Sequence, residues 1–133
     1  MAEFELRWSI KINKKRWVSR SLGEEKEKDY FLYRISVPRL LALSLINLVP
    51  CWDLKNKIIV FKQEQECGDG YLIRLRWASR RERNGRDNKV FTMYYISVPD
   101  DILEENNLLD QEPYLDPEKK VIVFRPKHDN VQS

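Results

Sequence analysis

A hexapeptide that occurs twice is the feature that most constrains how this chain can fold. Residues 33–38 read Tyr-Arg-Ile-Ser-Val-Pro, and residues 94–99 read Tyr-Tyr-Ile-Ser-Val-Pro. The flanking segments recur in the same order, with Leu-Arg-Trp at 6–8 and 75–77 and an apolar stretch ending in Phe at 58–61 and 121–124. Three matching segments in the same order indicate a tandem repeat of about 65 residues. We predict repeat 1 over residues 1–66, repeat 2 over 67–126 and a flexible tail over 127–133.

Each repeat is predicted to form a long hairpin, a short helix after the proline, and a short hairpin. In repeat 1, apolar and polar residues alternate over residues 4–12, the period of two that is typical of a strand. Residues 30–37 are rich in aromatic and β-branched residues and favour the return strand, whereas the polar residues 19–29 predict a solvated loop. Pro38 suits the first turn of a helix, which we expect over residues 39–48.

The second repeat follows the same plan with a shorter hairpin tip. Residues 81–88 contain Asn84-Gly85, a strong tight-turn signal. The remaining elements are strands over 73–77, 90–98 and 121–124 and a helix over 100–109, with a polar linker over 63–70 between the repeats. A unit of roughly 65 residues buries little core alone. The sequence therefore predicts a mainly β fold with two short helices, in which both repeats share one core.

Charge is separated along the chain, although the net charge is only +3. Two segments are basic and contain a single acidic residue, Glu82; their cations are Arg7, Lys11, Lys14, Lys15, Arg16 and Arg20, then Arg74, Arg76, Arg80, Arg81, Arg83 and Arg86. Such clusters create a local positive field that the net charge hides. We interpret the clusters as candidate nucleic-acid-binding residues. The alternative is a solvated sheet face whose Lys and Arg guard exposed strand edges.

Catalytic and metal chemistry find little support in the sequence. The chain has one histidine, His128, and lacks phosphate-cradling glycine motifs. Cys51 and Cys67 form no CxxC, which argues against a zinc site. We predict no enzymatic activity, no cofactor, no metal and no small-molecule substrate. The two cysteines are expected to be free thiols in a reducing cytoplasm.

The sequence also predicts a cytoplasmic, nucleoid-associated protein without a membrane partner. No apolar run approaches the ~20 residues that span a bilayer. The first residues lack the basic and apolar regions of a secretory signal.

The pattern of a strand ending in Ile-Ser-Val-Pro, a short leucine-bearing helix and a strand–turn–strand resembles the swapped-hairpin domain of the AbrB, MazE and SpoVT family. The matching leucines are Leu41, Leu45 and Leu48 in repeat 1 and Leu103, Leu108 and Leu109 in repeat 2. In that family two small chains exchange hairpins to form one β-barrel, so the resemblance implies such a dimer fused into one chain. It also implies binding of duplex DNA, as a transcriptional regulator or chromatin-type protein, by basic strand residues before the proline, including Arg34.

The chemistry of the basic strands agrees with that expectation. Arg74 and Arg76 share one face of a strand and lie about 7 Å apart, given a rise of ~3.3 Å per residue. A two-stranded ribbon fits the major groove of B-DNA. Trp8 and Trp77 fall on the apolar alternation and are predicted in the core. For Trp17 two roles stay open: packing in the hairpin or core, or stacking on an unpaired base.

A protein-binding adaptor is the alternative function. The first helix is unusually apolar, and Leu40, Leu43 and Ile46 would form a patch for a protein partner or a homodimer if they are exposed. An antitoxin-like protein or an accessory subunit of a nucleic-acid machine would have this patch.

Overall fold

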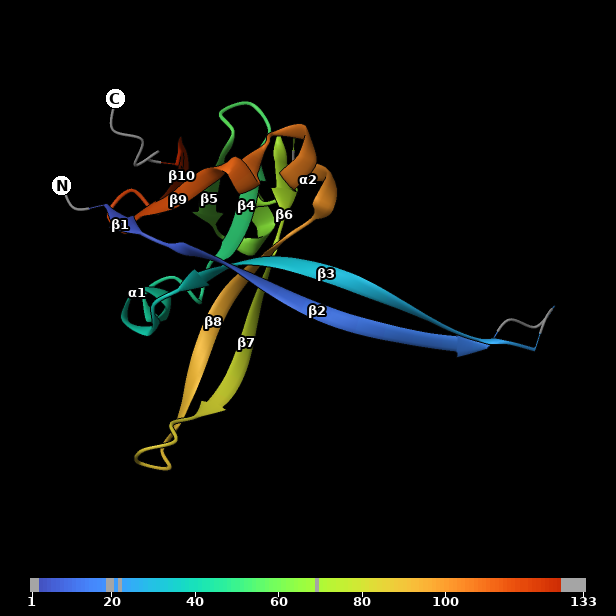
Figure 1. The fold of residues 1–133 in the computed structure, drawn as a ribbon. Helices are drawn as coiled ribbons and strands as arrows, with labels where there is room; N and C mark the ends of the chain where they lie inside the picture. Colours follow the sequence, from blue (N-terminus) through green and yellow to red (C-terminus); the bar gives the residue numbers. More distant parts are fainter. Residues whose placement is uncertain (1–2, 19–20, 22, 69, 128–133) are drawn as a thin grey trace, which may run out of the picture.

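The computed structural model describes residues 3–18, 21, 23–68 and 70–127, and they form a mainly β protein with two antiparallel sheets (Figure 1). The strands are β1 Phe4–Glu5, β2 Arg7–Val18, β3 Glu25–Val37, β4 Val49–Asp53, β5 Ile58–Lys62, β6 Leu72–Arg74, β7 Arg76–Arg83, β8 Val90–Val98, β9 Gln111–Asp116 and β10 Val121–Pro126. The helices are α1 Arg39–Leu43 and α2 Asp100–Glu105, with 3-10 turns η1 Glu64–Glu66 and η2 Leu108–Asp110.

The four-stranded sheet has the order β2-β3-β8-β7, and its two hairpins extend well beyond it. We call the β2–β3 hairpin arm 1 and the β7–β8 hairpin arm 2. Strands β3 and β8 pair in an antiparallel register in which Ile35 lies opposite Ile96. Figure 1 shows the arms diverging from the body in different directions. The arms therefore present strand faces that the rest of the protein does not cover.

The six-stranded sheet has the order β1-β9-β10-β5-β4-β6, and it interleaves strands from the two repeats. Phe4 at the start of the chain pairs with Leu115, and the corresponding Ile73 pairs with Trp52. At the centre, Ile59 lies opposite its repeat counterpart Ile122. Backbone pairing thus joins segments that are distant in sequence.

Corresponding residues make corresponding contacts throughout this arrangement. Trp8 Nε1 donates a hydrogen bond of 2.8 Å to the carbonyl of Gln111, and Trp77 Nε1 donates one of 3.0 Å to that of Leu48. The Trp8 ring stacks on Phe124 with centroids 6.0 Å apart, and its counterpart Trp77 stacks on Phe61 at 5.8 Å. Both tryptophans are half-buried and pack against the core, as their place in the alternation predicts.

The core lies between the two sheets and draws on both repeats. Its fully buried side chains include Trp52, Ile59 and Ile122 from the six-stranded sheet and Ile35 and Ile96 from the four-stranded sheet. Ala42 and Leu45 of the α1 region and Ile102 and Leu103 of α2 also belong to this cluster. One shared core explains how two units of this size stay folded together.

The closed barrel implied by the resemblance is wrong for this chain. The strands form two separate sheets, and each sheet has free edges. The chain crosses between the sheets at two buried residues, Leu6 between β1 and β2 and Leu75 between β6 and β7. Beyond these crossings the chain leaves the six-stranded sheet, and β2 and β7 pair with β3 and β8 to form the arms (Figure 1). A barrel cannot close because these strands pair with each other and point away from the body.

Several predicted boundaries are also corrected. Helix α1 ends at Leu43 rather than at residue 48, and α2 ends at Glu105, followed by the separate turn η2. Strand β3 begins at Glu25, inside the segment predicted as loop, because it pairs with β2 as far as Val18. Strand β7 continues to Arg83, and the linker contains η1. Of the predicted tail, residues 128–133 lie outside the described residues.

Asp53 and Asp116 hold the turns of the two short hairpins in the same way. Asp53 Oδ1 accepts hydrogen bonds from the backbone N–H groups of Lys55 and Asn56, at 2.9 and 3.1 Å. Asp116 Oδ1 accepts the equivalent bonds from Glu118 and Lys119, at 3.0 and 3.1 Å. Partial burial raises the pKa of Asp53, but its hydrogen bonds outweigh that effect, and the net pKa is lowered.

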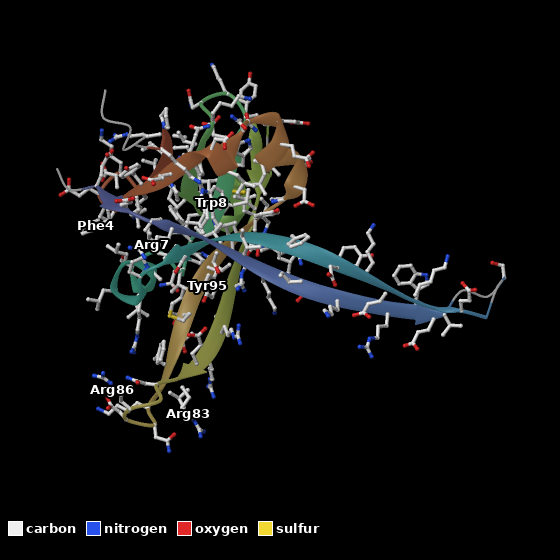
Figure 2. All side chains as sticks on the ribbon, in the orientation of Figure 1. Phe4, Arg7, Trp8, Arg83, Arg86 and Tyr95 are labelled. Atoms are coloured by element: carbon white, nitrogen blue, oxygen red, sulfur yellow. A yellow bond between two sulfur atoms is a disulfide. The ribbon has the colours of Figure 1, made fainter. Side chains whose placement is uncertain are left out.

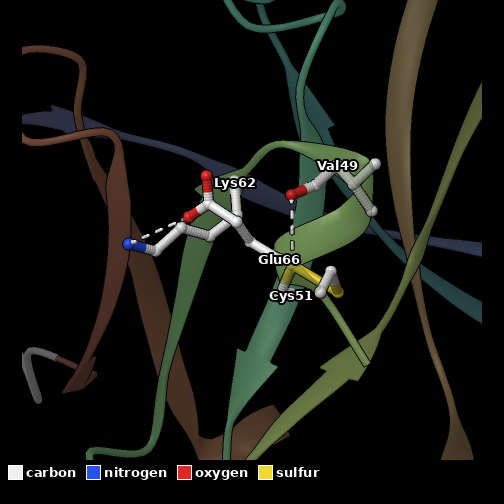
Figure 3. Close-up of polar contacts among 5 residues, drawn as sticks. Val49, Cys51, Lys62 and Glu66 are labelled. Carbon is white, nitrogen blue, oxygen red and sulfur yellow. Dashed lines mark hydrogen bonds and ion pairs between the residues drawn. A yellow bond between two sulfur atoms is a disulfide. The ribbon is translucent and has the colours of Figure 1, made fainter. Parts of the chain in front are cut away.

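The expectation of two free thiols is wrong, because Cys51 and Cys67 form a disulfide (Figure 3). Cys51 is buried in β4, and Cys67 follows η1, which brings the linker back against that strand. The Cα atoms are 5.9 Å apart. Figure 3 also shows the Lys62–Glu66 ion pair, 3.9 Å long, beside the disulfide. Spacing along the chain alone does not reveal this proximity.

Reduction of the disulfide is expected to lower the free energy of unfolding by about 3 kcal/mol, because the bond closes a loop with a sequence separation of 16. Urea unfolding with and without dithiothreitol measures the change. The variant Cys51→Ser/Cys67→Ser should match the reduced wild type and should not respond to dithiothreitol. Equal unfolding midpoints for the oxidised and reduced wild type would contradict the prediction.

Candidate nucleic-acid interface

The register of the four-stranded sheet gives it an apolar inner face and a basic outer face. Ile35 and Ile96 are 0% exposed and define the inner face, which packs on the core. Because side chains alternate between the faces of a strand, the outer face is formed by the neighbouring positions. Its two central rows are Arg7–Ser36–Tyr95–Ala78 and Ser9–Arg34–Ser97–Arg76. These rows contain no acidic residue.

Arg7 and Arg76 occupy corresponding positions on the outer face. Each lies one residue before the tryptophan that packs on the core, so each is directed away from the core. Both are exposed. Figure 2 labels Arg7 and Tyr95 near the place where the arms meet. The repeat thus places two exposed arginines on opposite edges of one sheet face.

Along arm 1 the outer face stays basic. Lys11 lies opposite Leu32, and Lys26 lies opposite Trp17. Lys28 shares this face with Tyr30, two positions further along the strand. The three lysines are exposed, and none of the described strand residues on this face is acidic.

The inner face of arm 1 carries the acids instead. Lys14 lies opposite Asp29, and Arg16 lies opposite Glu27. Glu27 is 3.6 Å from Lys14 Nζ and 3.9 Å from Arg16 Nε. The candidates Lys14 and Arg16 are therefore neutralised locally, whereas the lysines of the outer face are not.

Arm 2 carries cations on both faces. Arg80 continues the outer face and lies 3.9 Å from Glu82. Arg81 and Arg83 lie on the inner face beyond the body, opposite Thr92 and Val90. Arg83 and Arg86 lie near the tip in Figure 2, and both are exposed. Arm 2 therefore extends the basic surface to its tip.

Arg34 and Arg74 have partners within the fold. Arg34 is 8% exposed, and its Cζ lies 4.0 Å from the ring centroid of Tyr95, its counterpart in the repeat. This cation–π contact holds the Arg34 guanidinium against Tyr95. Arg34 is therefore a buried part of the sheet surface between Arg7 and Arg76. Arg74 makes an ion pair of 2.9 Å with Glu64. Arg20 and the side chain of Lys15 lie outside the described residues.

Lys26 and Lys28 are exposed outer-face cations that the sequence prediction did not include. The segment was expected to be a loop, so its acids appeared to balance its lysines. The signal was present, because residues 25–30 read Glu-Lys-Glu-Lys-Asp-Tyr, a strict alternation of acid with Lys or Tyr. In a strand that alternation directs the acids to one face and the lysines to the other.

The predicted protein-binding residues lie on the outside of the α1 region. Leu40 is 85% exposed, Leu43 is 48% exposed and Ile46 is 39% exposed. Leu45, in contrast, is 1% exposed and belongs to the core, and the partly buried Leu41 packs against that core. The leucine-rich segment thus has one buried side and one exposed apolar side.

Within the part of the chain that the structure describes, no three His, Cys, Asp or Glu side chains are arranged to hold a metal ion. No helix of the described residues is long and apolar enough to cross a membrane. Comparison with known proteins finds no matching family model, no similar curated protein and no similar solved structure.

Proposed function

We propose that this protein binds duplex DNA through the outer face of the four-stranded sheet and the two arms. The separation of charge by strand register carries the proposal. Among the described residues, six exposed cations share the outer face with a single acid, Glu82; they are Arg7, Lys11, Lys26, Lys28, Arg76 and Arg80. The acids of arm 1 lie on the opposite face, where Glu27 pairs with Lys14 and Arg16.

Affinity would come from phosphate contacts and the release of counterions from the DNA. Each neutralised phosphate contributes about −0.9 to the slope of log K against log salt. Six contacts would give a slope of about −5, and an affinity loss of about 10³-fold between 50 and 200 mM salt. Such contacts position the protein on DNA but carry little sequence information.

The arms suit the grooves of the duplex. A two-stranded ribbon fits the major groove, which is about 12 Å wide. The tip of arm 2, with Arg81, Arg83 and Arg86, would enter this groove, where arginine can also contact guanine. The body would stay outside on the phosphates, held by Arg7 and Arg76.

We further propose that the fold is a tandem swapped-hairpin unit, a pseudo-dimer in one chain that is similar to the AbrB, MazE and SpoVT family. The exchange of edge strands supports this proposal, because β1 of repeat 1 pairs with β9 of repeat 2, and β6 of repeat 2 pairs with β4 of repeat 1. Two equivalent backbone hydrogen bonds also support it. The N–H of Leu6 donates to the carbonyl of Pro113 at 2.8 Å, and the N–H of Leu75 donates to the carbonyl of Pro50 at 2.9 Å. A transcriptional regulator or a chromatin-type protein would use DNA binding of this kind.

Fluorescence anisotropy with a labelled random-sequence duplex tests the proposal. We expect binding at 50 mM salt that weakens with a log–log slope of about −5 as salt increases. A slope near zero would indicate contacts other than phosphate neutralisation. No binding at low salt would exclude the proposed function.

A protein-binding role of the α1 region is the second candidate, favoured by the exposure of Leu40, Leu43 and Ile46. If this surface serves a homodimer, sedimentation velocity should show a dimer that the variant Leu40→Ser/Leu43→Ser loses. The variant should unfold at the same urea concentration as the wild type, because neither side chain belongs to the core. A monomeric wild type at high concentration would exclude the homodimer.

A further inference from the structure

We propose that the outer face of arm 1 also binds single-stranded nucleic acid, by stacking unpaired bases on Tyr30 and Trp17. This inference rests on the proposed function, because the same cations would hold the backbone. It differs from that function in its ligand, since a duplex keeps its bases stacked on each other. Proteins that bind single strands combine a positive groove with aromatic platforms.

The two aromatic side chains lie on the outer face and are accessible. Tyr30 lies opposite Asn13, and Trp17 lies opposite Lys26, which places both rings on the outer face. Each is 39% exposed. Tyr30 and Lys26 lie four residues apart on one strand, so the two rings are separated by about 13 Å along the arm. The separation leaves room for bases on each ring.

Lysines lie beside both rings. Lys28 Nζ is 5.4 Å from the ring centroid of Tyr30, and Lys26 is the cross-strand neighbour of Trp17. Residues two apart on a strand are spaced by about 6.6 Å, so a cation accompanies each ring. A phosphate on the lysine and a base on the ring would be adjacent parts of one nucleotide. The absence of described acids on this face favours an anionic ligand.

Among the described residues of the two arms, this combination occurs on the outer face of arm 1. On the inner face of arm 1, Ile10, Ile12 and Phe31 are exposed, but the cations that follow them on this face, Lys14 and Arg16, are paired with Glu27. On arm 2, the outer face has Met93 and Phe91, but Glu82 is opposite Phe91 and lies 3.9 Å from Arg80. The two arms have therefore diverged. Of their described residues, those on the outer face of arm 1 combine exposed aromatic rings with lysines and include no acid, whereas the outer face of arm 2 carries Glu82.

The test measures the affinity of the full chain for fluorescein-labelled dT20 and for a labelled 20-bp duplex. Tyr30→Ser and Trp17→Ser are each expected to weaken dT20 binding by about 5- to 100-fold, the range for loss of a base-stacking ring. Both variants should bind the duplex within about threefold of the wild type. Phe31→Ser is the matched control, because it removes a neighbouring exposed ring from the opposite face. It should leave dT20 binding unchanged.

Cross-linking gives a second measurement that does not depend on the folding of variants. Single-stranded oligonucleotides with 5-bromouracil, irradiated on the wild-type protein, should form adducts on Tyr30 or Trp17. Duplex binding without dT20 binding would overturn this inference and leave the proposed function standing. Binding of neither probe would overturn both. Equal losses of dT20 binding in Tyr30→Ser and Phe31→Ser, or adducts on Phe31, would also overturn it.

Discussion

Removal of four outer-face cations is expected to reduce duplex affinity on the order of 10³-fold at about 0.1 M salt. The variant changes Arg7, Lys11, Lys26 and Arg76 to Ser. These side chains have no role in the core, so the fold should survive. Because each lost contact changes the salt slope by about 0.9, the slope should fall from about −5 to about −1 or −2. Anisotropy titrations at several salt concentrations measure both quantities.

A control variant with the same loss of charge separates the outer face from net charge. It changes to Ser four cations that pair with acids in the structure: Lys14, Arg16, Arg74 and Arg125. Exposed ion pairs of this kind contribute only about 0–1 kcal/mol each to stability. We expect its salt slope to stay close to that of the wild type. Equal losses in the two variants would mean that total charge, rather than the outer face, governs binding.

Replacement of Trp52 by Ala is expected to lower the free energy of unfolding by about 3–5 kcal/mol. Trp52 is 0% exposed and contacts Phe124 edge-to-face, with centroids 5.9 Å apart. Its strand is paired on both sides, opposite Ile59 in β5 and Ile73 in β6. The strands cannot collapse into the space that the indole leaves, so the cavity remains. Loss of this size is a large share of the stability of a small domain.

Urea unfolding measures this effect against two controls. Trp52→Phe keeps an aromatic ring in the core and should lose less than half as much. It also removes a buried Nε1–H that has no hydrogen-bond partner among the described residues. Leu40→Ala, at a position that is 85% exposed, should change the free energy of unfolding by less than about 0.5 kcal/mol. A loss below about 1 kcal/mol for Trp52→Ala would contradict the assignment of this residue to the core.

Local patterns predicted the elements of this fold well. The alternation around Trp8 and Trp77 predicted the strands and the inward direction of both rings, because the period of side chains on a strand is two. Pro38 and Pro99 marked the start of both helices. The helix ends were placed too late, since leucines at helical spacing such as Leu48 also occur in the turns that lead into the next strand.

The candidate site was predicted only in part. The local composition predicted that both arms are basic. Which of these basic residues lie on the same face depends on the residues opposite them in the paired strands. Lys14 and Arg16 lie among the basic residues in sequence, yet the register places them across from Asp29 and Glu27. Lys26, in the acidic segment of the sequence, faces the opposite way. A count of charges along the sequence groups residues that the strand places on opposite faces of the sheet.

The sequence by itself determined that two similar units are present and that each consists of a long hairpin, a short helix and a short hairpin. Only the tertiary structure decided which strands pair between the repeats, that the two sheets stay open rather than closing into a barrel, and that Cys51 meets Cys67. The physical reason is that repetition and alternation are local properties of the chain. Hydrogen-bond register and the disulfide join residues brought together by the shared core, and local preferences do not specify those partners.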